Sequence, residues 1–378
     1  MALSLCNLFN SEMKLLILSS STGGGHDMRA KALAEWVGPK KLETRILRPI
    51  DENSHLYNAG VKLYNLIQKY APRLHFFYFH FLEHANLHRD HRKILGNRKF
   101  IREIKQFNPN LVISMHAHLN HAYFNLAKKF LGEKVNFVVY CGELSGGSGF
   151  SRHWINPRVD LLITPTEESR QFSITRGMPA SKVKNCGLLL RKPFYRSANI
   201  DRDSERLLKI GIKEGESFVL LATGANGANK HKKICKYLCK KNYSSTIVAL
   251  CGESESFRES LTELCLPNRT RIIALPKQSA DEMASLMKRA VCCVGRPGAG
   301  LTSEALACGT PMIFELINGA MPQEINNLNF WKKKCGRINS IKSPKELYFL
   351  LQKNIPSPKF RMPDSPEKLL KELDLMIN

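Results

Sequence analysis

The sequence predicts an α/β protein made of two doubly wound, Rossmann-like domains in tandem. Its 378 residues are enough for two domains of ordinary size. Short, continuously apolar runs alternate with helical patterns, which is typical of parallel strands buried on both faces of a sheet. The alternation stops at a polar segment after residue 190 and then begins again. We therefore place the first domain at residues 1–195 and the second at residues 196–378.

Each predicted strand is a short apolar run. In the first domain the run at residues 14–20 precedes three glycines and a helical pattern at 29–37, and further strands are expected at 111–115, 135–140, 160–163 and 183–186. In the second domain strands are expected at 218–223, 246–251, 271–274, 290–294 and 311–314. A final helix at 365–377 follows a proline-rich passage that would let it return to the first domain. Two such domains are expected to face a central cleft at the carboxyl ends of their strands.

The chain is strongly basic, with 57 Lys+Arg against 33 Asp+Glu and a net charge of +24. Such a charge favours polyanionic partners, namely nucleic acid, an anionic membrane surface or phosphorylated small molecules. The 11 cysteines include no Cys-x-x-Cys pair, so we expect reduced core thiols and a cytoplasmic protein. We see no signal peptide and no apolar run of about 18 residues, so any membrane contact is expected to be peripheral.

A glycine-rich loop follows the first predicted strand. The sequence Ser-Thr-Gly-Gly-Gly-His at residues 21–26 places Gly24 and Gly25 where backbone amides can approach a ligand, with His26 facing the same space. Met28 occupies the third glycine position of a dinucleotide-binding loop, and no Gly-Lys-Ser/Thr follows. A tight turn with a helix-capping histidine is the alternative interpretation.

Two further glycine loops lie in the second domain. The first, at residues 223–229, occupies the equivalent place after a strand. The second, Gly-Arg-Pro-Gly-Ala-Gly at residues 295–300, precedes a helix expected at 301–308; its amides suit a pyrophosphate, with Arg296 as the counter-charge. Glu304, expected in the first turn of that helix, is suited to accept hydrogen bonds from ribose hydroxyls. The alternative is a glutamate that only caps the helix.

These loops, their spacing and the motif Pro-Gln-Glu-x-x-Asn at residues 322–327 resemble the MurG-like glycosyltransferases of family 28, which have the GT-B fold. Within them the sequence is most similar to the branch of monogalactosyldiacylglycerol synthases and processive diacylglycerol glucosyltransferases. The resemblance extends from about residue 14 to residue 337 and includes the stretches 109–121, 153–157 and 185–194. It departs from the family at Arg296, usually Lys, at Leu301, usually Thr, and at Gly142-Glu143, usually Thr-Asp.

The resemblance implies inverting transfer of a hexose from a UDP-sugar to a lipid hydroxyl, with neither metal nor cofactor. Glycine-loop amides would hold the phosphates, the turn after Leu275 the uracil, Glu304 the ribose, and Gln323 with Glu324 the sugar hydroxyls. The residues assigned to the donor are Gly224, Asn226, Gly227, Leu275, Arg296, Gly298, Gly300, Glu304, Gln323, Glu324 and Asn327. The metal-motif-like Asp-Arg-Asp at 201–203 lies in the linker, and we interpret it as a solvated charge cluster.

Inverting transfer requires a base beside the acceptor hydroxyl. His26 is the first candidate for that base and Glu143 the second. His116 and His121 are expected to shape the acceptor site.

The segment at residues 55–107 combines aromatic side chains with a basic cluster. Phe76, Phe77 and Phe79 are the apolar anchors that a lipid surface requires, and the cations suit anionic headgroups. The same mixture could stack on single-stranded nucleic acid, or form a helical hairpin packed on the first sheet.

We expect a diacylglycerol-type acceptor, action at the cytoplasmic face of a membrane and no nucleic-acid partner. Two other hypotheses stay open, a GT-B-fold UDP-sugar epimerase or hydrolase and a non-catalytic basic nucleic-acid-binding protein.

Overall fold

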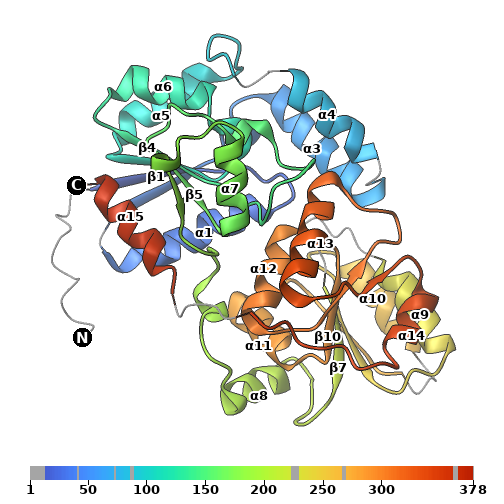
Figure 1. The fold of residues 1–378 in the computed structure, drawn as a ribbon. Helices are drawn as coiled ribbons and strands as arrows, with labels where there is room; N and C mark the ends of the chain where they lie inside the picture. Colours follow the sequence, from blue (N-terminus) through green and yellow to red (C-terminus); the bar gives the residue numbers. More distant parts are fainter. Residues whose placement is uncertain are drawn as a thin grey trace. The chain divides into compact units, whose positions relative to one another are not determined.

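The computed structural model describes residues 13–40, 42–71, 74–85, 89–222, 230–265, 270–360 and 365–377. These residues fall into two compact units (Figure 1). The first takes the described residues up to Leu66, those of Leu74–Arg191 and those from Ser365 onward, and the second takes Lys192–Asp364 with a short piece that begins at Ile67. Each unit contains one six-stranded sheet in which every pairing is parallel.

The sheet of the first unit has the strand order β2-β1-β3-β4-β5-β6. Its strands are β1 (Lys14–Leu18), β2 (Glu43–Leu47), β3 (Leu111–Ser114), β4 (Asn136–Tyr140), β5 (Leu161–Thr164) and β6 (Val183–Asn185). The helices are α1 (Gly25–Val37), α2 (Pro49–Glu52), α3 (His55–Tyr70), α4 (His75–Ala85), α5 (Asn97–Phe107), α6 (Ala122–Leu131), α7 (Glu167–Thr175) and α15 (Glu367–Ile377). Three-residue 3₁₀ turns at Ala117–Leu119 and Arg152–Trp154 follow β3 and β4.

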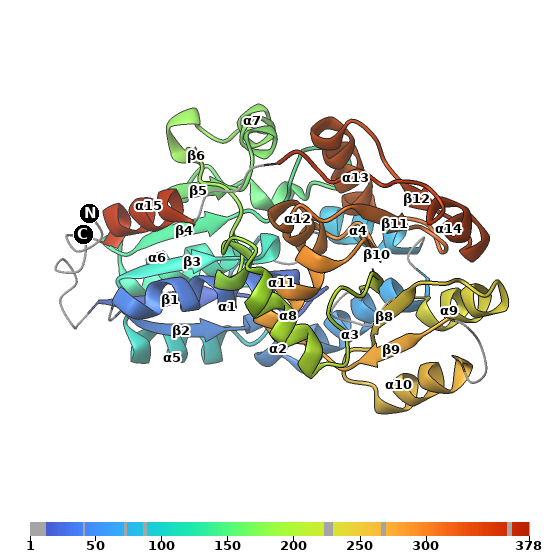
Figure 2. The ribbon, with the colours of Figure 1, turned by 90° about the horizontal axis from the view of Figure 1, so that it is seen from below.

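Alternate residues of the first sheet enter two different cores. Leu15 and Ile17 pack with α1 and α15, whereas Leu16 and Leu18 pack with α5 and α6. Figure 2 shows helices on both faces of this sheet. The C-terminal helix α15 therefore completes the core of the first unit, and Lys40 holds Asp374 there with Nζ 2.8 Å from Oδ1.

The sheet of the second unit has the order β12-β11-β10-β7-β8-β9. Its strands are β7 (Phe218–Leu221), β8 (Thr246–Leu250), β9 (Ile272–Leu275), β10 (Cys292–Gly295), β11 (Met312–Glu315) and β12 (Ser340–Ile341). The helices are α8 (Ile200–Lys209), α9 (His231–Lys240), α10 (Glu255–Thr262), α11 (Ala280–Arg289), α12 (Ala299–Cys308), α13 (Pro322–Cys335) and α14 (Pro344–Leu350).

The predicted fold class is confirmed, and each of the ten predicted strands is present within one or two residues at either end. The prediction missed β2 and β12, which lie at sheet edges. β2 carries Glu43 and Arg45 and has no fully buried residue, so its sequence lacks the apolar run of a central strand. The prediction of a polar linker was also wrong in part, because that segment contains helix α8.

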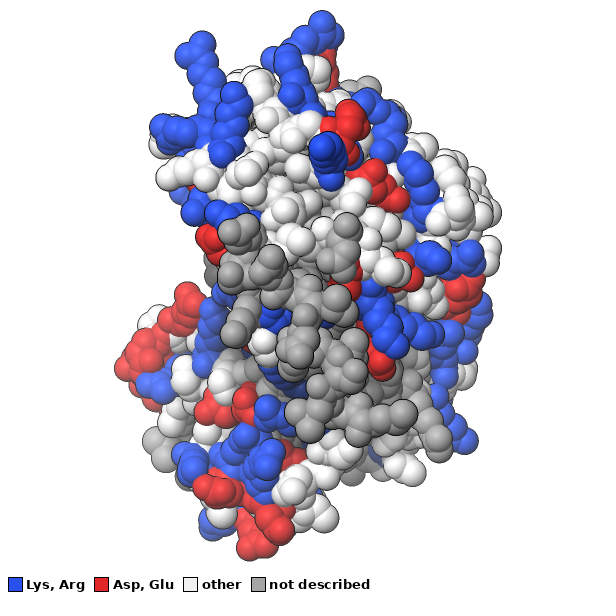
Figure 3. Space-filling view, turned by 90° about the vertical axis from the view of Figure 1, so that its left-hand side faces the viewer, with Lys and Arg blue, Asp and Glu red and all other residues white. Residues whose placement is uncertain are grey.

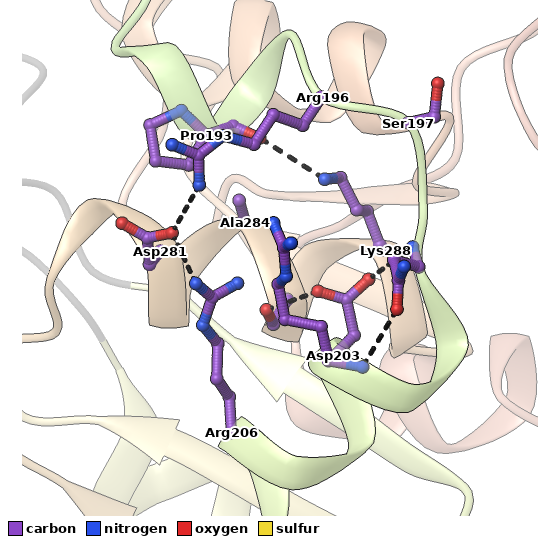
Figure 4. A pocket seen from close by; sticks show the side chains of 11 residues that line it. Pro193, Arg196, Ser197, Asp203, Arg206, Asp281, Ala284 and Lys288 are labelled. Carbon is purple, nitrogen blue, oxygen red and sulfur yellow. Dashed lines mark hydrogen bonds and ion pairs between the residues drawn. The ribbon is translucent and has the colours of Figure 1, made fainter.

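A small pocket between α8 and α11 corrects the interpretation of the Asp-Arg-Asp motif (Figure 4). Asp203 is 3% exposed and accepts a hydrogen bond from Ser285 Oγ at 2.6 Å, so it is not solvated. Arg196 and Arg206 both donate to Asp281, at 2.9 and 2.7 Å. These contacts hold α8 and the residues just before it against α11. The carboxylates of Asp203 and Asp281 already accept hydrogen bonds from these neighbouring donors.

The expectation of reduced cysteines holds for eight of those described, among them Cys141, Cys186 and Cys293. Cys239 is disulfide-bonded, so the expectation was wrong for that residue. The oxidised Cys239 lies in α9 of the second unit.

Candidate functional site

The first glycine loop is a left-handed turn that feeds helix α1. Gly23 and Gly24 have φ values of 63° and 73°, which L side chains rarely adopt, so the glycines are a backbone requirement. The loop is held from outside by Asp51, whose carboxylate accepts hydrogen bonds from the Ser21 amide at 3.1 Å and from the Ser21 hydroxyl. These bonds fix the start of α1 and with it the position of His26, the second residue of the helix.

His26 is held as a neutral imidazole with a defined tautomer. Its Nδ1 lies 2.6 Å from the carbonyl oxygen of Met115, and because a carbonyl only accepts, Nδ1 carries the proton and Nε2 keeps its lone pair. Burial, assisted by the positive charge of Arg29, lowers the pKa of His26 to about 4. His26 therefore offers a basic nitrogen at neutral pH, although a weak one.

The pKa of Glu143 is shifted in the opposite direction to that of His26. Burial raises its pKa to about 7, and the positive Arg29 and a hydrogen bond from Trp154 moderate the rise. The Trp154 ring also lies 6.1 Å from the His26 ring, so both candidate bases flank one indole. A carboxylate that titrates near neutral pH is matched to general base catalysis at that pH.

Arg29 was missed by the sequence prediction. It lies one helical turn after His26, donates from Nη2 to the Gly142 carbonyl at 2.9 Å, and influences the pKa of both His26 and Glu143. A Cβ atom at Gly142 would lie too close to the Arg29 guanidinium, so a larger residue there would require the Arg29 side chain to move. The spacing of three residues from His26 was the available signal.

His116 and His121 have different surroundings. His116 packs edge-on against His26 with ring centroids 4.5 Å apart, and its Nε2 lies 3.0 Å from Thr22 Oγ1 in the glycine loop. His121 lies at the start of α6, where burial and three nearby arginines lower its pKa to about 4. The structure thus brings His116 to the candidate bases and associates His121 with His153, at 6.0 Å between rings.

In the second unit, a small pocket lies at the carboxyl ends of β7 and β10. Lys230, Arg296 and Glu315 line it together with His231 and Gly295. Burial raises the pKa of Glu315, and the nearby Arg296 and Lys230 oppose that rise. Two cations at the carboxyl ends of parallel strands suit a diphosphate.

Arg296 and Glu324 form a buried ion pair. Arg296 Nε lies 2.9 Å from Glu324 Oε1, and Nη2 of the same guanidinium donates to the Gly319 carbonyl at 3.0 Å. Glu324 is 1% exposed, and Oε2 also accepts from the Met321 amide at 2.8 Å. The geometry therefore gives Glu324 the task of holding Arg296 and the start of α13, which differs from the sugar contact implied by the resemblance.

Asn327 and Gln323 lie on the same helix as Glu324. Asn327 Nδ2 donates to the Pro297 carbonyl at 2.8 Å, which ties α13 to the loop before α12. Gln323 lies in the first turn of α13, beside Glu324 and less deeply buried than it. The sugar-binding assignment thus fits Gln323 better than Glu324.

The remaining donor residues lie along the same sheet and helix. Helix α12 begins at Ala299, earlier than predicted, so the prediction that Glu304 lies in its first turn was wrong. Glu304 lies in the second turn and is half-buried. Burial raises the pKa of the Cys293 and Cys308 thiols, and the nearby charge of Glu304 adds to that rise. Gly298 caps α12, Gly300 lies within it, and Leu275 ends β9. Gly224, Asn226 and Gly227 lie outside the described residues.

Helices α3 and α4 form a hairpin, as in the alternative interpretation of this segment, but they expose apolar side chains that the alternative would pack on the first sheet. Phe76, Phe77 and Phe81 are 48%, 71% and 61% exposed, whereas Phe79 is half-buried. The leucines at positions 56, 63 and 66 of α3 are also exposed. An exposed apolar patch of this kind marks a site of contact with protein or lipid. None of the described helices is both long enough and apolar enough to span a bilayer.

Comparison with known proteins gives two family matches that together span both units. Residues 26–190 match the family model for monogalactosyldiacylglycerol (MGDG) synthase, and residues 218–373 match the glycosyltransferase family 28 C-terminal domain. A processive diacylglycerol beta-glucosyltransferase of Bacillus pumilus is 23% identical over 330 residues, which cover 85% of this chain and 82% of the relative.

A probable chloroplastic monogalactosyldiacylglycerol synthase of Glycine max is 24% identical over 354 residues, covering 88% of this chain and 63% of the relative. The crystal structure of MurG from Acinetobacter baumannii is similar in fold, with a TM-score of 0.53 and 14% identity over 97% of this chain and 94% of that chain. These matches agree with the resemblance drawn from the motifs.

Proposed function

Because this chain belongs to the MurG-like, UDP-sugar-dependent glycosyltransferases of family 28, we propose that it transfers a hexose from a UDP-sugar to a diacylglycerol-type lipid. Within that family it lies in the branch of the MGDG synthases and processive diacylglycerol glucosyltransferases. The transfer inverts the anomeric carbon, needs neither metal nor cofactor, and takes place at the cytoplasmic surface of an anionic membrane, to which the protein binds peripherally.

The observation that carries the proposal is the presence, in one unit, of an apolar outward-facing hairpin and a carboxylate tuned to neutral pH. Phe77 is 71% exposed on α4, and the pKa of Glu143 is about 7. The hairpin suits a lipid acceptor, and Glu143 suits a reaction in which a hydroxyl loses its proton.

In this mechanism the hydroxyl oxygen of the lipid acceptor bonds to the anomeric carbon of the sugar, and Glu143 accepts the proton of that hydroxyl. The bond from that carbon to the phosphate oxygen breaks at the same time, and the leaving UDP retains the electron pair. Arg29 favours the ionised form of Glu143, and His26 and His116 line the acceptor side of the glycine loop. In the second unit, the pocket cations Lys230 and Arg296 stabilise the negative charge on the departing diphosphate.

The proposal is tested by supplying labelled UDP-glucose, UDP-galactose and UDP-N-acetylglucosamine with vesicles that contain diacylglycerol. We expect one of these donors to yield a β-linked glycolipid, with unchanged rates in the presence of EDTA. Conversion of the donor to an epimer or to free sugar without lipid would support the epimerase or hydrolase hypothesis instead.

The surface charge bears on the nucleic-acid hypothesis. On the face shown in Figure 3, Lys and Arg side chains occur in separate groups with Asp and Glu among them, and they do not form a continuous basic stripe. We expect binding to vesicles rather than to oligonucleotides, because the exposed apolar side chains of the hairpin suit a lipid surface. Tight, salt-sensitive binding to oligonucleotides without vesicle binding would contradict the proposal.

Replacing Phe76, Phe77 and Phe81 together by Ser is expected to abolish the salt-resistant part of vesicle binding, and glycolipid synthesis with it. These side chains are exposed, so their loss should leave the core unchanged. Cosedimentation with phosphatidylglycerol vesicles at low and high salt measures the effect. Phe349→Ser is a matched control, because Phe349 is 54% exposed on α14 in the second unit. Equal binding of the triple variant and the control would place the lipid surface elsewhere.

Glu304→Gln is expected to weaken UDP binding by about 1–3 kcal/mol, the value of hydrogen bonds to a charged group. The change keeps the size of the side chain and removes its charge. Isothermal titration calorimetry with UDP measures the affinity, and Glu205→Gln on the exposed face of α8 serves as control. An unchanged UDP affinity would mean that Glu304 does not bind the ribose.

A further inference from the structure

The hairpin has the reverse of the polarity that helices at a water-exposed surface usually show. Several of its apolar side chains point outward, and several of its polar side chains point inward. On α3 the leucines at 56, 63 and 66 point outward, while Val61 is buried in the core of the first unit. On α4 Phe77 and Phe81 are exposed, while His75 and Glu83 are buried. Polar groups on the inward faces of both helices are thus available to contact the interior of the first unit.

On α3 the inward polar groups hold the first glycine loop. Asn65 Oδ1 accepts a hydrogen bond from the Gly23 amide at 3.1 Å. About two turns earlier, Asn58 Nδ2 donates to the carbonyl of Asp51 at 2.8 Å, and the Asp51 carboxylate in turn holds Ser21. The Asn65 contact ends on the loop that precedes His26, and the Asn58 contact reaches that loop through Asp51.

On α4 the inward carboxylate of Glu83 holds a different catalytic segment. Glu83 is 9% exposed and accepts from the Ser151 hydroxyl at 2.5 Å and from the Arg152 amide at 2.8 Å. These residues begin the 3₁₀ turn that carries Trp154, and Trp154 donates a hydrogen bond to Glu143. Glu83 therefore supports the indole that lies between the two candidate bases.

The two helices are also joined to each other. Tyr78 on α4 donates from its hydroxyl to the Gly60 carbonyl on α3 at 3.2 Å, and the rings of Tyr64 and His75 lie 4.6 Å apart. A displacement of one helix is thus expected to move the other. The hairpin has two polar anchors: the half-buried Asn65, which holds the loop before His26, and the buried Glu83, which holds the turn that carries Trp154.

We propose that Asn65 and Glu83 are positioning residues, which transmit the docking of the hairpin on a lipid surface to the His26 loop and to the Trp154–Glu143 pair. The inference rests on the proposed function. A lipid surface that fixes the exposed leucines and phenylalanines restricts the hairpin, and the two anchors restrict the catalytic side chains in turn. The left-handed Gly23-Gly24 turn consists of glycines without side chains, so contacts from Asn65 and Asp51 hold the loop.

Substitution at Asn65 separates positioning from binding. Asn65→Leu removes the acceptor for the Gly23 amide, whereas Asn65→Asp keeps an oxygen in the same place. We expect Asn65→Leu to lower kcat on vesicle diacylglycerol at least tenfold with unchanged vesicle and UDP affinity, and Asn65→Asp to retain most of the wild-type kcat. Lys62→Gln, an exposed position on the same helix, is the control. An equal loss in Asn65→Asp and Asn65→Leu, or a loss explained by weaker vesicle binding, would overturn the proposal.

Hydrogen–deuterium exchange tests the coupling without relying on turnover. On addition of phosphatidylglycerol vesicles, the wild-type protein should gain protection at residues 21–28 and at 151–154. Asn65→Leu should lose the gain at 21–28 only, and Glu83→Gln the gain at 151–154 only. No gain in the wild type that binds vesicles would refute the inference. Gains that follow this pattern in a protein that makes no glycolipid would uphold the coupling and refute the proposed function instead.

Discussion

Glu143→Gln is expected to lower kcat about 10²–10⁴-fold, the usual contribution of a general base, while UDP affinity stays the same. Glutamine keeps the shape of the side chain and its hydrogen-bonding capacity toward Trp154, but it cannot accept the acceptor proton. Steady-state kinetics on diacylglycerol vesicles and calorimetry with UDP measure the two effects. A kcat within threefold of the wild type would exclude Glu143 as the base.

The pH dependence of kcat/KM separates Glu143 from His26. A base must be unprotonated, so the rate falls tenfold per pH unit below its pKa. With Glu143 as the base the acidic limb lies near pH 7, and with His26 it lies near pH 4. His26→Ala should leave a limb near pH 7 in place. A limb near pH 4 that disappears in His26→Ala would transfer the role to the histidine.

The same pKa has a consequence for stability. The pKa of Glu143 is about 7 in the folded protein and close to the ordinary glutamate value of 4.5 in the unfolded chain, so between these pH values the folded state binds more protons. The free energy of unfolding therefore falls as the pH rises through this window. Glu143→Gln should be more stable than the wild type at pH 8, as measured by urea unfolding, although it is nearly inactive.

The second large effect is expected at the buried ion pair. Glu324→Gln leaves the Arg296 guanidinium buried without its counter-charge, so it should lower the free energy of unfolding by about 3–5 kcal/mol. Arg296 is 8% exposed and Glu324 is 1% exposed, which makes hydration an ineffective substitute. Urea unfolding measures the loss, and UDP-sugar binding is expected to weaken because the loop before α12 loses its support.

The double variant Arg296→Met with Glu324→Leu is the control for this prediction. Removing both charges should recover much of the stability that Glu324→Gln loses, because no buried charge then lacks a partner. A change of less than 1 kcal/mol in Glu324→Gln, together with loss of sugar-donor binding, would restore Glu324 as a direct contact to the sugar.

The central strands could be predicted because each is buried on both faces and is therefore continuously apolar. β1 and β7 are examples, with four buried residues each. The edge strands β2 and β12 could not, because β2 has no fully buried residue and β12 has only two residues. An edge strand tolerates charged residues such as Glu43 and Arg45, and these interrupt the apolar run by which a buried strand is recognised in the sequence.

The site was predicted only in part for a similar reason. Motifs identified His26, Glu143, Arg296 and Glu324 as chemically important, since each lies in a loop or in a first helical turn that follows a strand. Pairings between distant residues were invisible, because nothing in the sequence relates Arg296 to Glu324 or Arg29 to Gly142. The burial that separates the pKa of His26 from that of Glu143 is likewise a property of the folded chain.

The central claim, that the sugar is transferred to a lipid, is tested most directly by comparing UDP released with glycolipid formed. The measurement uses the wild-type protein and the preferred UDP-hexose, with and without vesicles that contain diacylglycerol. We expect one glycosidic bond in the lipid fraction for each UDP released, and negligible UDP release without the lipid. Release of UDP at the same rate in the absence of diacylglycerol, with no sugar in the lipid fraction, would contradict the claim.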